Sequence, residues 1–220
     1  MANDSSIGSI LTTPKSKLRN LPKTQQEWYP DNDGVHQIYN TPLQTGKELD
    51  ANQGKDPSHR GTCGIVSCVN ILRLAGRLDA TESEVLTDAI AQGLCTTNDK
   101  LPASSGGTTS VSRQQILKRF GLESELIHPS TDAIAEYVSA GKGVIISVFA
   151  GRLWKDLRYH NAYHAVVVTS VVKNESGNVT GFYICDSGRR TNDCAHFYTV
   201  EELKYALTPR KMNVTTSIIR

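Results

Sequence analysis

The first part of the chain beyond residue 60 has the hydrophobic spacing of helices. In GIVSCVNILRLAG the apolar residues at helical spacing are Ile65, Val66, Val69, Leu72 and Leu74, and Gly76 is a natural helix end. TESEVLTDAIAQG has a similar stripe, and Thr81 with Glu84 forms a capping-box pattern at its start. VSRQQILKRFG and STDAIAEYVSAG share the period. These four segments are predicted helices, with a polar loop over residues 94–110.

After residue 142 the pattern changes to β-branched and apolar runs of strand length. GVIISVFA and HAVVVTSVV read as buried strands, and NESGN forms a turn that leads into a third strand, VTGFYICD. HFYTV, a short helix in VEELKYAL and NVTTSII complete the chain. Helices followed by hairpin-connected strands predict an α+β domain with an antiparallel sheet.

The N-terminal segment differs from this pattern. Residues 1–50 are rich in Ser, Thr, Asn, Gln, Pro and Lys and show no sustained period of 2 or 3.6. They are predicted to form a linker or extended arm that is partly disordered, with EWYPDNDGVHQIYN as an ordered arm against the domain. Residues 51–220 are predicted to form one folded domain, which suits a chain of 220 residues.

Composition and charge argue against a nucleic-acid partner and against a membrane span. The 24 basic and 22 acidic residues give a net charge of +2, so nothing indicates a nucleic-acid partner. The longest apolar runs reach strand length only, whereas a membrane span needs about 20 residues. The chain is therefore expected to have no membrane span and no nucleic-acid partner.

The cysteines argue against a disulfide scaffold and against a zinc site. There are five of them, an odd number, and no CxxC pair occurs. No metal and no cofactor is expected. Cys185 and Cys194 flank a turn-like stretch and could pair in an oxidising compartment, but the sequence does not show the distance between them.

Three residues have the order and placement of a cysteine nucleophile with its partners. Cys63 directly precedes the first predicted helix, where backbone N–H groups and the helix dipole favour a thiolate. His164 opens one predicted strand, and Asp186 ends the next, 22 residues later across the NESGN turn. Adjacent antiparallel strands put these two ends side by side. We therefore expect Cys63 as nucleophile, His164 as base and Asp186 as the group that orients the imidazole.

Simpler interpretations exist for each of these residues. A cysteine before a helix can be a packed thiol, and an aspartate after a strand can be a turn residue. His160 is the rival base, although His164 abuts the strand more closely. Trp154 is expected to be a packing residue under the active-site loop. Gly61 and Gly64 are expected to let a substrate carbonyl approach the backbone.

With these residues in place, the sequence resembles the papain-like cysteine peptidases. It is closest to a bacterial branch that includes bacteriocin-leader peptidases and the papain-like toxin domains of polymorphic toxins, such as those of contact-dependent inhibition, type VI and Rhs systems. The segments that carry the resemblance are Gly61–Gly76, Gly106-Gly107-Thr108, Phe120-Gly121, the strand HAVVVTSV and Asp186-Ser187-Gly188.

The resemblance implies a papain-like fold, with a helical half that carries Cys63 and an antiparallel sheet that carries His164 and Asp186. Residues 51–220 would then be the catalytic domain. Papain-like enzymes usually have an oxyanion-hole glutamine six residues before the cysteine, and Pro57 occupies that position here. A longer loop would bring Gln53 to the oxyanion hole, with Asn52 as a substitute.

The resemblance also implies a function. The chain would be a bacterial effector toxin, delivered or secreted from a bacterium and acting in the cytoplasm of a target cell. Its substrate would be an amide or thioester bond of a protein, attacked as by a protease, a deamidase or a transglutaminase, and a cognate immunity protein would block the site. Two alternatives remain open: a catalytically degenerate binding module, and a peptidoglycan endopeptidase of the NlpC type, whose third residue is commonly a second histidine.

Overall fold

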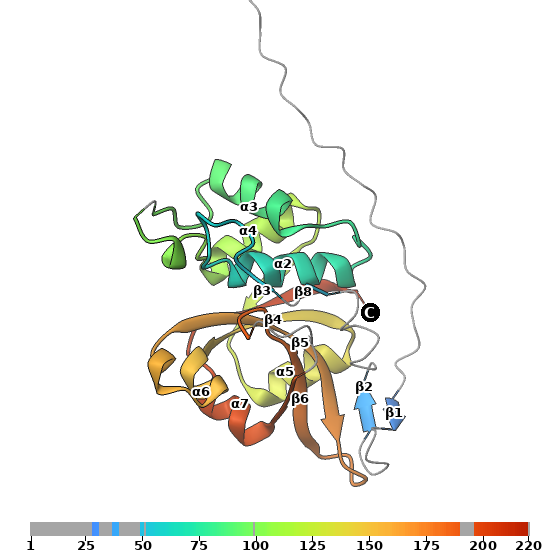
Figure 1. Ribbon diagram of the computed structural model, residues 1–220. Coiled ribbons are helices and arrows are strands. Elements are labelled where there is room, and N and C mark those ends of the chain that lie inside the picture. The colour runs from blue at the N-terminus through green and yellow to red at the C-terminus, as the bar shows by residue number, and fades with distance from the viewer. Residues whose placement is uncertain are drawn as a thin grey trace, which may run out of the picture.

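The apolar strands of the sequence assemble into one antiparallel sheet with helices on both faces (Figure 1). The structure is a computed structural model, and it describes residues 28–30, 37–39, 49–50, 52–98, 100–189 and 196–219. Its helices are α2 (Cys63–Leu74), α3 (Glu82–Ala91), α4 (Ser110–Arg119), α5 (Thr131–Ser139), α6 (Ala150–Trp154) and α7 (Val200–Ala206), with 3-10 turns η1 (Pro102–Ser104) and η2 (Leu157–Tyr159). The strands are β1 (Trp28–Pro30), β2 (Gln37–Tyr39), β3 (Ser124–Ile127), β4 (Lys142–Phe149), β5 (Tyr163–Lys173), β6 (Val179–Cys185), β7 (His196–Thr199) and β8 (Met212–Ile218).

The long strand β5 organises the sheet. Its first half pairs with β4, its second half pairs with β6 on the other edge, and its last residues pair with β2. The main order is β7-β6-β5-β4-β8-β3, and the β1–β2 pair adds to β5 beyond the end of β4. The hairpin between β5 and β6 brings the start of β5 beside the end of β6, as the sequence predicts.

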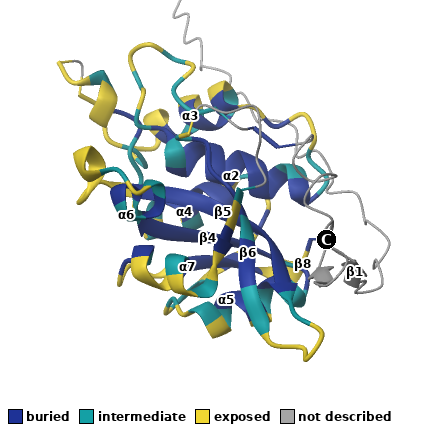
Figure 2. Cartoon of the chain, turned by 60° about the horizontal axis from the view of Figure 1, so that its bottom comes forward, coloured by how far each residue is buried: buried dark blue, intermediate teal, exposed yellow. Residues whose placement is uncertain are grey.

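The central strands are apolar on both sides because helices cover both faces of the sheet. On one face Ile145, Ala165 and Val167 pack with residues of α2, α3 and α4. On the other face Val144 and Val166 pack with residues of α5, α6 and α7. Strands covered on both faces read as continuous apolar runs, which explains GVIISVFA and HAVVV. Figure 2 shows α2, β4 and β5 as the buried centre of the molecule.

The four predicted helices and the α+β class are confirmed, with small differences at the helix starts. Thr81 accepts a hydrogen bond from the Glu84 N–H, but the Glu84 side chain binds Arg77 instead of completing a capping box. The third helix begins one residue earlier than predicted, at Ser110, and Thr109 is its N-cap. The strand β3 and the short helix α6 were not predicted at all.

The N-terminal segment contributes two short strands to the described structure. β1 and β2 pair with each other, and β2 continues the sheet beside the end of β5. Most of residues 1–48 lies outside the described residues, so the division of the chain at residue 50 stays a prediction. Among the helices that the structure describes, none has the length and apolar character needed to cross a membrane.

Candidate active site

Cys63 is the first residue of α2, and it is half-buried. The residue before it, Thr62, is the N-cap and is completely buried. The Thr62 hydroxyl accepts a hydrogen bond from the Gly54 N–H (2.8 Å) and donates to the Glu82 carboxylate. The start of α2 is therefore fixed by side chains, and the first-turn N–H groups stay available for a ligand because no side chain caps them.

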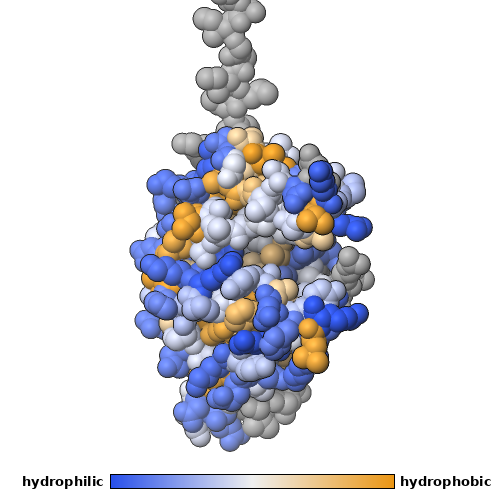
Figure 3. Space-filling model, turned by 90° about the vertical axis from the view of Figure 1, so that its left-hand side faces the viewer, coloured by the Kyte–Doolittle hydropathy of each residue, from blue (hydrophilic) through white to orange (hydrophobic). Residues whose placement is uncertain are grey.

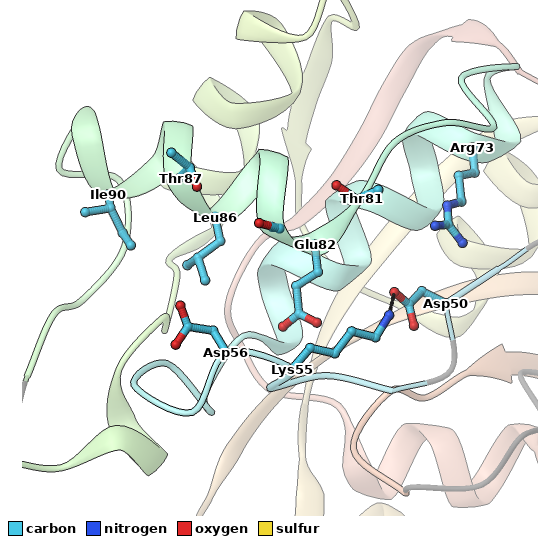
Figure 4. A pocket seen from close by; sticks show the side chains of 10 residues that line it. Asp50, Lys55, Asp56, Arg73, Thr81, Glu82, Leu86, Thr87 and Ile90 are labelled. Carbon is cyan, nitrogen blue, oxygen red and sulfur yellow. Dashed lines mark hydrogen bonds and ion pairs between the residues drawn. The ribbon is translucent and has the colours of Figure 1, made fainter.

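A cavity of about 510 Å³ lies between α3 and the segment around Lys55 (Figure 4). Glu82 extends from α3 into this region and is buried, with 3% of its surface exposed. Its carboxylate also accepts a hydrogen bond from the Gly54 N–H (2.8 Å), while Lys55 forms an ion pair with Asp50. Glu82 thus ties α3 to Thr62 and Gly54, the neighbours of Cys63 and Gln53.

The loop over residues 102–108 packs directly against the start of α2. The Gly61 N–H donates to the Ser105 carbonyl oxygen (2.7 Å). A Cβ atom at Gly64 would lie 1.8 Å from Thr108 Oγ1, and one at Gly61 would lie 2.9 Å from the Ser105 carbonyl oxygen. Both glycines are required by this loop. The expectation that they also let a substrate carbonyl approach the backbone stays a prediction.

His164 and Asp186 meet where β5 begins and β6 ends. His164 is the second residue of β5, and Asp186 directly follows β6. Their side chains approach with His164 Nε2 and Asp186 Oδ1 2.7 Å apart. Both are buried, with 5% of His164 and none of Asp186 exposed.

The imidazole also contacts the thiol. His164 and the backbone N–H of Ala165 lie close enough to the Cys63 thiol to lower its pKa. Because Nε2 of His164 is occupied by Asp186, Nδ1 is the ring nitrogen that faces Cys63. The structure thus brings the three predicted residues into one continuous chain, from Asp186 through His164 to Cys63.

The electrostatic interactions among Asp186, His164 and Cys63 favour an ion pair between His164 and Cys63. Burial works against the charged form of each group, but the interactions among them prevail. The charge and hydrogen bond of Asp186, followed by those of Cys63, raise the pKa of His164 to about 10. The hydrogen bond and charge of His164, then the Ala165 N–H, hold the pKa of Cys63 below its usual value. The interactions within the site therefore favour a thiolate beside an imidazolium.

Asp186 is held by two further donors that the sequence did not reveal. The indole Nε1 of Trp154 donates to Oδ2 (2.6 Å), and the Gly188 N–H donates to Oδ1 (2.9 Å). Burial raises the pKa of Asp186, but the charge and hydrogen bond of His164, with these two donors, bring it down to about 2. The Trp154 ring also packs on the imidazole, with centroids 5.2 Å apart. Trp154 is thus both a packing residue and a hydrogen-bond donor to the site.

We expect Trp154→Phe to slow alkylation of Cys63 by iodoacetamide about tenfold at neutral pH, because one donor to a buried carboxylate is lost. The phenyl ring keeps most of the packing on His164, so the thermal midpoint should change little. The measurement is the pH dependence of the alkylation rate for both proteins. An unchanged rate and pH dependence would show that the indole N–H does not support the site.

A buried arginine lies beneath the start of α2. Arg113 of α4 is only 2% exposed, and its hydrogen bonds go to neutral oxygens of Asn213, Ser110 and Ser147, each at 3.0 Å. A Cβ atom at Gly64, next to Cys63, would lie 3.3 Å from Arg113 Cδ. No carboxylate pairs with Arg113 among the described residues, so its positive charge acts on the thiol region, and it contributes to the lowered pKa of Cys63.

We expect Arg113→Met to raise the pKa of Cys63, because a buried positive charge near the thiolate is removed. Arg113→Lys should retain most of the effect. Arg119→Gln is the matched control, since Arg119 lies at the end of the same helix in a surface ion pair with Asp88. The pH midpoint of Cys63 alkylation measures the shift. A loss of thermal stability in Arg113→Met without any change in that midpoint would assign Arg113 a purely structural role.

Gln53 lies beside the residue that follows Asp186. Its N–H donates to the Ser187 carbonyl oxygen (3.1 Å), and its Oε1 accepts from the Ser187 hydroxyl (3.2 Å). Its Nε2 donates to the Arg60 carbonyl oxygen (3.2 Å). The longer loop thus brings Gln53 to the site, although its amide is engaged with Arg60 here, and its part in an oxyanion hole stays a prediction.

A cleft of about 830 Å³ opens beside the Asp186–His164 pair. The residues that line it are Asn52, Gln53, Gly54, Arg60, Ala103, Trp154, Tyr159, Gly188 and Arg189. Figure 3 views the molecule from the side of α6, where the surface is hollowed between the helical half above and α6 below. Asn52, the substitute proposed for Gln53, lines the same cleft.

The other histidine and cysteine candidates lie elsewhere. His160 is exposed at the end of η2, away from the buried start of β5, so it does not occupy the base position. Cys68 is fully buried, and burial raises its pKa to about 12, as expected for a core thiol. Cys185 is disulfide-bonded, whereas Cys63, Cys68 and Cys95 are free. Its expected partner, Cys194, lies outside the described residues.

Comparison with known proteins identifies the fold. The sequence matches no protein-family model and no curated protein. Among solved structures, a Bacillus anthracis protein described as a C39-like peptidase superposes with a TM-score of 0.55 and 15% identity, over 76% of this chain and 93% of that one. The chain therefore has the papain-like α+β fold that the sequence predicts.

Two further solved structures are similar. One is a double glycine motif protease from an AMS/PCAT transporter, in complex with the leader peptide, with a TM-score of 0.46 and 14% identity over 77% of this chain and 97% of that one. The other is the peptidase domain of Streptococcus ComA, a bifunctional ABC transporter, with a TM-score of 0.48 and 15% identity over 76% and 97%.

Proposed function

We propose that this chain is a cysteine peptidase, with Cys63 as nucleophile, His164 as proton carrier and Asp186 as the residue that orients and charges the imidazole. One observation supports this proposal above the others. The three side chains lie in a continuous row that runs from the buried Asp186 and His164 to a half-buried thiol at the N-terminus of a helix. Such an arrangement stabilises a thiolate beside an imidazolium, which is the resting form of a cysteine nucleophile.

In the first step the Cys63 thiolate attacks the carbonyl carbon of the scissile amide. A C–S bond forms, and the carbonyl oxygen becomes an oxyanion. His164 then gives its Nδ1 proton to the departing nitrogen, the C–N bond breaks, and the amine product leaves. Because His164 is charged before the attack, it acts first as an acid, and Asp186 keeps it in that state.

In the second step the neutral His164 takes a proton from a water molecule, and the resulting hydroxide attacks the thioester. The C–S bond breaks, the acid product leaves, and the thiolate and imidazolium are restored. An amine in place of water would transfer the acyl group instead. Hydrolysis, deamidation and transfer therefore share one site, and the choice of acceptor separates them.

The developing oxyanion needs donors at the start of α2. The Cys63 N–H is one of the uncapped N–H groups of the first turn, which point along the helix axis toward the attacking sulfur. Gln53 is the proposed second donor. Its Nε2 would have to leave the Arg60 carbonyl oxygen to reach the oxyanion, or the amide of Asn52 would take its place.

The test is incubation of the chain with a peptide library derived from a whole proteome, with Cys63→Ala as the control. New N-termini are identified by mass spectrometry, and products that contain added amines reveal transfer. Cleavage by the wild type alone supports a peptidase. Side-chain deamidation or crosslinking without new termini would support the other two reactions, and no Cys63-dependent product would contradict the proposal.

The displaced glutamine favours a second candidate, a papain-like scaffold that binds without catalysis. Pro57 stands where papain-like enzymes usually have this glutamine, and Gln53 uses its amide within the loop. Reactivity of the thiol separates the two. An enzyme should show Cys63 alkylated rapidly at neutral pH, and much more slowly in His164→Ala, whereas a binding module should show no such difference.

We further propose that the peptidase is an effector toxin that a bacterium delivers into the cytoplasm of a target cell, where a cognate immunity protein blocks the site. The support is the sequence resemblance of Gly61–Gly76, Gly106–Thr108 and the HAVVVTSV strand to polymorphic-toxin domains. The test is growth of bacteria that express the chain in the cytosol. Arrest by the wild type but not by Cys63→Ala supports the proposal, and arrest by both would contradict it.

A further inference from the structure

The cleft beside the site is positively charged. Among the nine residues that line it, Arg60 and Arg189 are the charged ones, and both side chains are exposed. Neither forms an ion pair with another described residue. The rest of the lining consists of two glycines, Ala103, the amides of Asn52 and Gln53, and the aromatic rings of Trp154 and Tyr159. No acidic residue of the described chain faces this cleft.

The cleft lies beside the imidazole ring of His164. Trp154 lines the cleft, and its ring packs on the imidazole. Gly188 also lines it, and a Cβ atom there would lie 2.9 Å from His164 Cε1 and 3.1 Å from His164 Nε2. In the proposed reaction, which this inference requires, His164 delivers its proton to the departing amine. The departing amine therefore lies next to His164, and the residues that follow it in the substrate can enter the adjoining cleft.

We infer that the cleft binds the substrate segment on the C-terminal side of the scissile bond, and that Arg60 and Arg189 select acidic residues in that segment. A guanidinium presents paired N–H donors that match a carboxylate, so each arginine can hold one acidic side chain. A channel with charge of one sign also attracts an oppositely charged peptide over some distance, and this attraction weakens with salt.

The aromatic rings give the cleft a wall that suits a side chain with an apolar stem. Trp154 and Tyr159 pack edge to face, with ring centroids 5.2 Å apart. Glutamate has a longer methylene stem than aspartate, so it can lie along these rings while its carboxylate reaches an arginine. Glutamate is therefore expected to be preferred over aspartate in this segment.

The experiment uses the same peptide library and counts the residues on each side of every cleaved bond. Acidic residues should be enriched about fivefold on the C-terminal side, as expected for partly exposed charge pairs, and the enrichment should fall with added salt. In Arg60→Gln/Arg189→Gln the enrichment should be lost. Arg119→Gln, which removes a surface arginine far from the cleft, should leave it unchanged.

Cleavage without acidic enrichment, or enrichment that persists in the double variant, would overturn this inference while the peptidase proposal stands. Binding tests the inference independently of cleavage. Cys63→Ala is mixed with fluorescent peptides that contain either glutamates or glutamines at the same positions. Tighter binding of the glutamate peptide that depends on Arg60 and Arg189 supports the inference even if no peptide is cleaved. Equal binding of both peptides would contradict it.

Discussion

Cys63→Ser is expected to lose peptide cleavage by a factor of about 10⁴ or more while the protein stays folded. A serine hydroxyl fits the space of the thiol, so the helix start and the Thr62–Glu82 contact should remain. Chemistry fails for a different reason. The charge and hydrogen bond of Asp186 raise the pKa of His164 and favour its protonated form, which cannot take a proton from a hydroxyl. The site therefore requires a nucleophile, such as a thiol, that loses its proton without a neutral imidazole as base.

The measurement is the cleavage rate on a peptide from the library, together with circular dichroism and a thermal midpoint. Cys95→Ser is the control, because Cys95 is a free thiol that lies in the 94–110 loop and takes no part in the site. Its rate should match the wild type. A Cys63→Ser protein within tenfold of the wild-type rate would mean that another group is the nucleophile.

Asp186→Asn is expected to have the second largest effect, a loss of about 10³- to 10⁴-fold in cleavage rate. The carboxylate accepts three hydrogen bonds, from His164, Trp154 and Gly188, and an amide cannot accept all three because its NH₂ group donates. The negative charge that raises the pKa of His164 is also lost. Burial then favours the neutral imidazole, and the thiolate loses its counter-charge.

The pH midpoint of Cys63 alkylation should therefore rise in Asp186→Asn. In the wild type, alkylation should begin at the lowered pKa of Cys63, and the imidazolium should persist to about pH 10. Asp132→Asn is the matched control, since Asp132 is a surface residue at the start of α5. The same midpoint in Asp186→Asn and the wild type would show that Asp186 does not charge the imidazole.

The same pair makes stability depend on pH in two directions. Asp186 has a pKa of about 2 against an ordinary value of 3.8, so its contribution is present above about pH 4 and is lost as the pH falls toward 2. His164 has a pKa of about 10 against 6.5, so its contribution is complete below pH 6.5 and is lost as the pH rises toward 10. Urea unfolding across this range should show both losses in the wild type and a flatter profile in Asp186→Asn.

Much of the fold could be predicted because its main elements are long and periodic. The apolar stripe of α2 and the β-branched apolar runs of β4 and β5 are long enough to tell a helix from a strand. β3 and α6 were missed for the opposite reason. SELI is four residues long and has no clear alternation, and α6 is five residues long, directly after β4. Their conformation is set by what they pack against.

The sequence by itself determined the order Cys63, His164, Asp186 and the elements that carry them. A short hairpin between two strands brings residues 22 positions apart to the same edge, and this follows from local pattern alone. It also determined that Cys63 stands at a helix start, because the apolar stripe begins immediately after it.

Only the tertiary structure decided what surrounds those three residues. Trp154 and Gln53 were expected near the site, but their hydrogen-bond partners there were not. Arg113 comes from α4, and no local pattern relates it to Cys63. Gly61 and Gly64 pack against a loop some 40 residues later in the chain, which leaves no room for a Cβ atom. Contacts between distant segments depend on how the helices pack on the sheet, and the local hydrophobic period carries no information about which side chains then meet.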